Sequence, residues 1–134
     1  MEGKIVKIIS NLYTVEANNN LYNCRARGKI KYNKLTPLVG DKVLFDNKEK
    51  YILEILPRKN SLDRPSISNI DSAILITSVK KPDLSLNLLD KQITLCVINN
   101  IEPIIVFTKL DLLNKKDLKY IKSIMKYYSN IGIK

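Results

Sequence analysis

The sequence has no histidine, no tryptophan and only two cysteines among its 134 residues. Cys24 and Cys96 are far apart, and neither belongs to a Cys-x-x-Cys pair. Structural zinc sites draw on closely spaced cysteine and histidine ligands, so these residues predict no zinc site. Both cysteines are expected to be reduced, half-buried, small apolar residues.

Glycine and long apolar runs are also scarce. No apolar run approaches the roughly 20 residues of a membrane-spanning helix, and the first residues lack the pattern of a secretory signal. We therefore expect a cytoplasmic protein that does not enter a membrane. The loop Gly-x-x-x-x-Gly-Lys-Ser/Thr, which cradles phosphates, is absent because no two glycines have that spacing. The only glycines are Gly3, Gly28, Gly40 and Gly132.

Acidic residues are few compared with basic ones. The chain has 23 Lys and Arg against 13 Asp and Glu, a formal net charge of +10. This excess predicts a polyanionic partner, and nucleic acid is favoured over a membrane because no basic amphipathic helix stands out. A lysine-rich, solvated surface produced by an AT-rich genome is the alternative interpretation.

The first 57 residues predict a small all-β barrel. Five short β-rich stretches alternate with turn signals, among them the asparagine run 18–20. Five strands in so short a segment are typical of a closed barrel of the SH3 or OB type, and the long third connection favours the OB fold. The expected strands are Lys4–Ile9, Leu12–Val15, Leu21–Arg27, Lys42–Phe45 and Tyr51–Leu56.

One segment of this barrel carries charge of a single sign. It contains no acid, and Tyr32 lies within it. Basic side chains can contact phosphates and an aromatic ring can stack on an unpaired base, so the segment predicts RNA binding. A solvated loop is the alternative. The candidate RNA-binding residues are Arg25, Arg27, Lys29, Lys31 and Lys34.

Residues 58–69 follow Pro57 directly, contain Pro65 and have few apolar side chains, and we expect them to form a linker. From residue 70 the pattern predicts strand, helix, strand, helix with parallel strands. Ala73–Thr77 and Ile104–Phe107 are the expected strands. Asp83 or Ser85 is expected to cap the first helix, and Asp117 the second. The predicted domains are therefore 1–57, the linker 58–69, and an incomplete α/β domain, 70–134.

The tetrapeptide Thr108-Lys109-Leu110-Asp111 directly follows the second of these strands. Ligands of open α/β sheets bind beyond the carboxyl ends of the strands. The Asp111 carboxylate can accept two hydrogen bonds, and guanine offers two adjacent N–H donors. The Lys109 stem can lie along a flat base. The tetrapeptide thus predicts a guanine-binding loop of the Asn-Lys-x-Asp type, and a solvated turn is the alternative.

Over nearly its whole length the chain resembles the N-terminal part of the circularly permuted GTPases that act on the small ribosomal subunit, the RsgA (YjeQ) type. The resemblance rests on the order and spacing of several stretches together. They are Cys24–Gly28, Pro37–Asp41, Pro57–Ser61, Arg64-Pro65, Asn69–Asp71, Pro82-Asp83, Ser85–Asp90, and Ile101–Pro103 leading to Thr108–Leu112.

The resemblance implies an OB-fold barrel that binds rRNA, followed by a partial P-loop GTPase-like domain in permuted order. In this order the guanine loop precedes the phosphate loop. It implies GTP as the ligand, Mg²⁺ and structural Zn²⁺ in the family, and the small ribosomal subunit with its rRNA as partner of a monomer. It assigns guanine binding to Thr108, Lys109, Leu110 and Asp111.

The sequence departs from the family in three ways. The phosphate loop and switch motifs are absent, the zinc ligands are absent, and Thr108 stands where the family has Asn. Because phosphoryl transfer depends on positioned phosphates and metal, we expect no GTP hydrolysis by this chain alone. Two alternatives remain open: a non-enzymatic OB-fold RNA-binding module left by truncation, and a chain without stable function.

Overall fold

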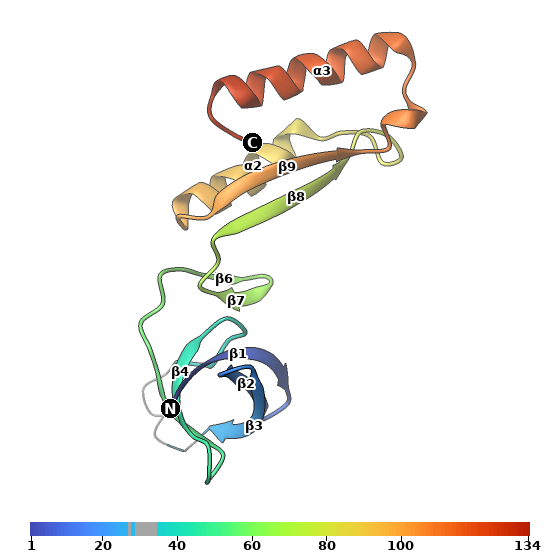
Figure 1. Cartoon of the computed structure of the whole chain (residues 1–134). Helices are drawn as coiled ribbons and strands as arrows, with labels where there is room; N and C mark the ends of the chain where they lie inside the picture. The colour runs from blue at the N-terminus through green and yellow to red at the C-terminus, as the bar shows by residue number, and fades with distance from the viewer. Residues whose placement is uncertain (27, 29–34) are drawn as a thin grey trace. The chain divides into compact units, whose positions relative to one another are not determined.

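The computed structural model describes residues 1–26, 28 and 35–134 (Figure 1). The chain divides into two compact units, Met1–Ile70 and Asp71–Lys134. Each unit has its own hydrophobic core.

The first unit contains a closed five-stranded barrel (Figure 1). Its strand order is β1-β2-β3-β5-β4, and antiparallel pairing of β1 with β4 closes it. The predicted all-β barrel is therefore confirmed, with the parallel β3–β5 pair that an OB-type order requires. The strands are β1 (Glu2–Ile9), β2 (Leu12–Ala17), β3 (Asn20–Ala26), β4 (Lys42–Asp46) and β5 (Tyr51–Ile55).

Alternation along these strands fills the barrel with apolar side chains. Ile5, Val15, Phe45 and Ile52 are completely buried, and Cys24 is buried with them rather than half-buried. The β2–β3 hairpin turns through two asparagines at 18 and 19, with φ of 50° and 59°. Asparagine tolerates this left-handed conformation, which two-residue hairpin turns require at both positions.

Residues 58–69, which the sequence predicts to be a linker, contain a hairpin of β6 (Ser61–Asp63) and β7 (Ser66–Ser68). They belong to the first unit, whose boundary lies at Ile70. Hydrogen bonds hold the hairpin in place: the Ser68 hydroxyl donates to Asp41 at 2.6 Å, and the Asn69 side chain donates to the Gly40 carbonyl at 2.9 Å. The structure therefore differs from the predicted linker. The hairpin is held by polar contacts to distant residues, and such contacts leave no apolar pattern in the segment from which a strand could be predicted.

The second unit contains two parallel strands and two helices, as predicted. β8 (Ser72–Ser78) and β9 (Glu102–Thr108) pair in register from Ser72↔Glu102 to Ser78↔Thr108. A 3-10 turn, η1 (Leu110–Leu112), follows β9. The helices are α2 (Leu86–Ile98) and α3 (Lys115–Asn130).

Both helices begin at side-chain caps. Ser85, one of the two residues predicted as the cap, caps α2 by accepting from the Leu88 amide at 3.3 Å. Asn114 caps α3 and accepts from the Asp117 amide at 2.8 Å. The expectation that Asp117 caps this helix is wrong. The cap is Asn114, three residues earlier, and Asp117 lies in the first turn, where its amide is the one that Asn114 satisfies.

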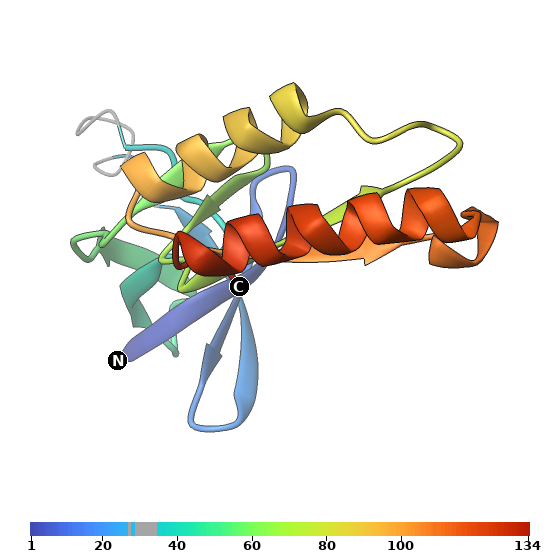
Figure 2. The same ribbon diagram turned by 90° about the horizontal axis from the view of Figure 1, so that it is seen from above.

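Both helices pack on one face of the β8–β9 sheet, and α3 runs beside α2 (Figure 2). Their buried side chains meet Leu75, Ile105 and Phe107 of the strands. The Tyr128 hydroxyl of α3 donates to Asp90 of α2 at 2.6 Å. The other sheet face leaves Ile74 63% and Ile76 74% exposed. Among the described residues, no helix is long and apolar enough to cross a membrane.

Candidate guanine loop and basic surfaces

The predicted guanine loop lies where the parallel pair ends. Because β8 and β9 run in the same direction, the segments after Ser78 and Thr108 leave the same edge of the sheet. The Val79 amide donates to the Thr108 carbonyl at 3.2 Å, and the Thr108 hydroxyl donates to the Thr77 carbonyl at 3.3 Å. Thr108 thus uses its hydroxyl to hold the two strand ends together.

Lys109 turns the chain out of the strand. Its φ of 63° is in the left-handed region, and its ammonium donates to the carbonyl of Lys81. Lys81 lies in the β8–α2 connection and also has a positive φ, 51°. Lys109 therefore joins the two loops that follow the parallel strands.

Leu110 and Asp111 follow in the 3-10 turn, where the Leu112 amide donates to the Lys109 carbonyl at 3.1 Å. Asp111 is exposed. Within the part of the chain that the structure describes, its carboxylate forms no hydrogen bond or ion pair. The turn therefore presents a carboxylate whose acceptor positions are open to a ligand, beside the Lys109 stem.

The described residues include no group of three or more His, Cys, Asp or Glu side chains that could hold a metal ion. Cys24 and Cys96 are free, buried and in different units. Burial raises the pKa of both thiols, although nearby Lys50 lowers that of Cys24 in part. These residues do not fit a zinc or magnesium site, and we derive no step through either metal.

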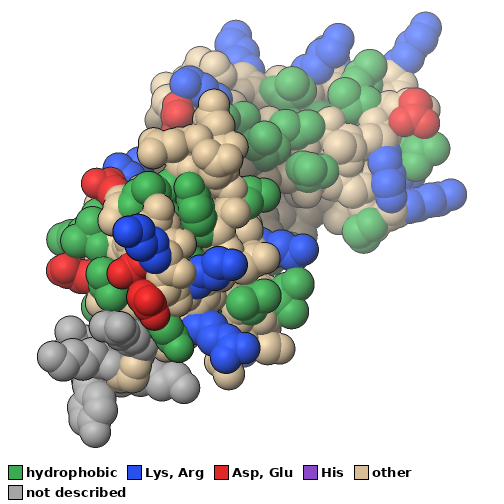
Figure 3. Space-filling model, turned by 60° about the horizontal axis from the view of Figure 1, so that its bottom comes forward, with side chains coloured by type: hydrophobic (Ala, Val, Ile, Leu, Met, Phe, Trp, Pro, Cys, Tyr) green, Lys and Arg blue, Asp and Glu red, His purple; other side chains and the backbone are tan. Residues whose placement is uncertain are grey.

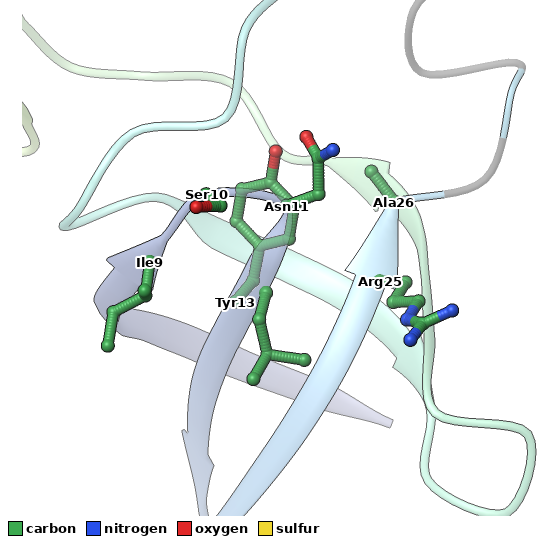
Figure 4. A pocket seen from close by; sticks show the side chains of 7 residues that line it. Ile9, Ser10, Asn11, Tyr13, Arg25 and Ala26 are labelled. Atoms are coloured by element: carbon green, nitrogen blue, oxygen red, sulfur yellow. The ribbon is translucent and has the colours of Figure 1, made fainter.

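Of the predicted RNA-binding residues, the structure describes Arg25, which is exposed on β3. Arg27, Lys29, Lys31 and Lys34 lie outside the described residues. Arg25 borders a hollow of about 490 Å³ on the barrel (Figure 4). The side chains lining this hollow come from β1, the β1–β2 turn, β2 and β3: Ile9, Ser10, Asn11, Leu12, Tyr13, Arg25 and Ala26.

The floor of this hollow is largely apolar. Ile9 is 57% and Leu12 40% exposed, and Tyr13, which pairs with Cys24 of β3, is buried. An apolar platform beside an exposed guanidinium suits a flat base whose phosphate contacts the cation. Figure 3 shows further Lys and Arg side chains that stand out from the surface.

A second basic surface, which was not predicted from the sequence, lies on α3. The statement that no basic amphipathic helix stands out is wrong for this helix: one face packs in the core and the opposite face is lysine-rich. The signal in the sequence is the spacing of Lys115, Lys119, Lys122 and Lys126, which recur at intervals of four, three and four residues.

Both halves of the chain match the sequence models of known protein domains. The sequence model of the RsgA N-terminal domain matches residues 2–52, and that of the RsgA GTPase matches residues 55–134. The small ribosomal subunit biogenesis GTPase RsgA 2 of Oceanobacillus iheyensis is 45% identical over 134 residues, 98% of this chain and 46% of that protein. The corresponding RsgA protein of Caldanaerobacter subterraneus is 40% identical over 137 residues, all of this chain and 45% of its own length.

Two solved structures share the fold. The crystal structure of YloQ, described as a circularly permuted GTPase, has a TM-score of 0.82 and 42% identity. The crystal structure of YjeQ from Thermotoga maritima has a TM-score of 0.86 and 33% identity. In both cases the match covers 98% of this chain and 49% of the other.

The strand order β1-β2-β3-β5-β4 and the parallel β8–β9 pair that ends in Thr108–Asp111 define the class of protein. It is an OB-type barrel joined to part of a circularly permuted GTPase domain. The chain belongs to the RsgA family. It spans about half the length of the curated relatives that it matches.

Proposed function

We propose that this chain acts in the biogenesis of the small ribosomal subunit, where its barrel binds rRNA and its second unit reads the guanine of GTP. The names of its relatives, which are 40–45% identical, support this role. We place it in the cytoplasm, as a monomer when free.

One observation carries the nucleotide part of the proposal. Thr108–Asp111 leaves the carboxyl end of β9, beside the loop that leaves β8, with the Asp111 carboxylate unpartnered among the described residues. This is the edge at which open α/β sheets bind their ligands. The position of these four residues at the strand end and the resemblance to the RsgA type both support the guanine assignment.

Each residue of the loop has a distinct task. Asp111 accepts from the two N–H groups on one edge of guanine, which adenine cannot offer. The Lys109 stem lies against the base, and its ammonium stays on the Lys81 carbonyl. Thr108, which replaces the amide of the family's Asn, ties the loop to β8 through its hydroxyl. We expect guanine selectivity to follow from Asp111 and affinity to be weakened by Thr108.

Hydrolysis requires more than base recognition. Phosphoryl transfer is catalysed by groups that position the phosphates, the metal and the attacking water. The 134 residues contain no Gly-x-x-x-x-Gly-Lys-Ser/Thr loop, so we expect hydrolysis to require residues that this chain does not supply.

The barrel supplies the RNA contact. Arg25 is exposed beside the apolar hollow, and we extend the contact to Arg27, Lys29, Lys31 and Lys34. Five cations without an intervening acid attract a phosphate backbone and predict binding that weakens steeply with salt.

The guanine assignment is tested in a protein of full family length. Residues 1–134 replace the matching part of the Oceanobacillus iheyensis relative, and nucleotide preference is measured with and without Asp111→Asn. The unmodified chimera should prefer GTP, whereas Asp111→Asn should prefer xanthosine triphosphate, because an amide NH₂ pairs with the carbonyl that replaces guanine's amino group.

Leu112→Ala is the matched control, because Leu112 is partly exposed in the same turn and should not change the preference. Retention of GTP preference by Asp111→Asn would show that the carboxylate does not read the base.

A further inference from the structure

The exposed face of α3 carries a stripe of lysines. Lys115, Lys119, Lys122 and Lys126 are all exposed. At 3.6 residues per turn they fall within about 60° of one another around the helix axis and span roughly 16 Å along it. The core residues Ile121, Ile124 and Tyr128 lie on the opposite side of the helix. We call these four residues the lysine stripe.

Helix stability does not account for the lysine stripe. Lys115 is in the first turn, where the helix dipole disfavours positive charge, and the last turn holds no basic residue. Successive members of the stripe are three or four residues apart and repel one another. A partner that neutralises them would relieve this repulsion.

Among the residues that the structure describes, no acid neutralises the stripe. Within the described residues, its four lysines form no ion pair or hydrogen bond. Asp117 is the single acid of α3, and its carboxylate lies 3.8 Å from the ammonium of Lys80, outside the helix. The stripe therefore presents four unpaired ammonium groups in a row.

Two exposed aromatic rings lie on one flank of α3, between the stripe and the buried face. Tyr120 is 58% and Tyr127 60% exposed, and helix geometry places them roughly 130° and 110° from the stripe's centre, and about 100° and 80° from Lys119, its nearest member. The Tyr127 and Tyr128 rings form a T-shaped pair with a centroid distance of 5.3 Å. Exposed rings next to a line of cations match the needs of an RNA strand, whose unpaired bases stack while its phosphates pair.

We propose that the lysine stripe and Tyr120 form a second RNA-binding surface, separate from that of the barrel, which contacts the phosphates and an unpaired base of a single-stranded RNA segment. The inference rests on the proposed function in that it takes RNA as the partner. An anionic membrane is disfavoured, because the apolar face of α3 packs in the core and cannot enter a bilayer.

The stripe is tested by removing two of its charges. We compare Lys119→Gln/Lys122→Gln with the control Lys48→Gln/Lys91→Gln, which removes two exposed lysines from elsewhere. The 134-residue chain is titrated against a fluorescein-labelled RNA hairpin with a single-stranded tail, and anisotropy is read at several salt concentrations. Glutamine is nearly as good a helix former as lysine, so thermal unfolding should change little.

The stripe variant should bind roughly tenfold more weakly near physiological salt, and its slope of log affinity against log salt should fall by about 1.4 to 1.8, while the control stays within about twofold of the unmodified chain. Equal losses in stripe and control variants would overturn the proposal. So would a stripe variant that binds RNA normally but loses binding to phosphatidylserine vesicles.

Tyr120 gives an independent readout. Tyr120→Ala should weaken binding of the single-stranded tail alone by several-fold and leave a blunt duplex unaffected, since only unpaired bases stack. Tyr120→Phe keeps the ring and should bind like the unmodified chain. Equal losses for tail and duplex would count against stacking.

A variant of the barrel distinguishes failure of the stripe proposal from failure of the proposed function. Arg25→Gln should weaken binding in either background. If Arg25→Gln weakens binding while the stripe variant does not, the stripe proposal fails and barrel binding stands. If the unmodified chain binds no RNA, both fail.

Discussion

The guanidinium of Arg58 meets the carboxylate of Asp41 through two hydrogen bonds, of 2.7 Å from Nε to Oδ1 and 2.8 Å from Nη2 to Oδ2. Asp41 is completely buried, and it also accepts from the Leu38 amide at 2.8 Å. The pKa of Arg58 is raised chiefly by this hydrogen bond to Asp41. The pair fastens the segment that follows the barrel to the loop that precedes β4.

Loss of one partner of this pair should be costly. Arg58→Met leaves a buried carboxylate without its cation, and we expect it to lower the free energy of unfolding of the first unit by about 3–5 kcal/mol. Urea titration followed by circular dichroism measures the change. Arg58→Met combined with Asp41→Asn should recover much of the loss. A combined variant as unstable as the sum of the two single variants would mean that the two side chains act independently.

Gly40 and Gly132 allow backbone strain to be separated from steric overlap. Both have positive φ, 95° and 85°. A Cβ at Gly40 would lie 2.1 Å from the Ser68 carbonyl oxygen, whereas one at Gly132 would meet nothing within 4 Å. Gly132→Ala should therefore cost only the strain of about 1–2 kcal/mol, and Gly40→Ala clearly more, as measured by urea unfolding. Equal costs would show that the overlap relaxes freely.

The two buried thiols should report separately on the two units. Cys24 is 0% and Cys96 4% exposed, and burial raises the pKa of each. In native buffer both should react with a disulfide reagent far more slowly than a free thiol, because little thiolate is present and access is blocked. In Cys24→Ala the remaining thiol, Cys96, reports on the second unit. In Cys96→Ala the remaining thiol, Cys24, reports on the first unit.

Increasing urea should expose the two thiols at different midpoints if the units unfold independently. Immediate reaction of either thiol in native buffer would contradict the burial described for that unit.

Tyr128 should make the second unit sensitive to alkali. Burial and the hydrogen bond to Asp90 raise its pKa above the ordinary value. A raised pKa contributes stability that is complete below the unfolded pKa of about 10 and is lost as the pH rises above it. Unfolding of the second unit should therefore become easier above about pH 10, and the effect should be smaller in Tyr128→Phe.

Tyr120→Phe, which changes an exposed tyrosine of the same helix, is the control for general alkaline effects. An alkaline loss of stability that is the same in both variants would exclude Tyr128 as its source.

The apolar pattern of the sequence and its turn signals were sufficient to predict the barrel strands and the parallel β8–β9 pair. It also predicted the Ser85 cap, because a cap acts on the amide three residues along the chain. The hairpin at 61–68 could not be predicted in this way, because its position depends on Ser68 contacting Asp41, 27 residues away.

The candidate sites likewise have some features that the local sequence predicts and others that depend on the fold. Thr108–Asp111 could be proposed as a guanine loop because a short motif follows a strand directly. The hydrogen bond from Lys109 to Lys81, however, requires two loops that only the fold brings together. The lysine stripe was missed because its spacing acquires meaning only once Ile121 and Ile124 are known to be buried on the other side of the helix.

Under the proposed function, this chain acts on the small ribosomal subunit through its RNA-binding surfaces. The direct measurement is co-sedimentation of the 134-residue chain with purified small and large ribosomal subunits over a range of salt concentrations. We expect preferential binding to the small subunit, weakened by salt and by Arg25→Gln. Equal binding to both subunits, or binding insensitive to salt and to Arg25→Gln, would contradict it.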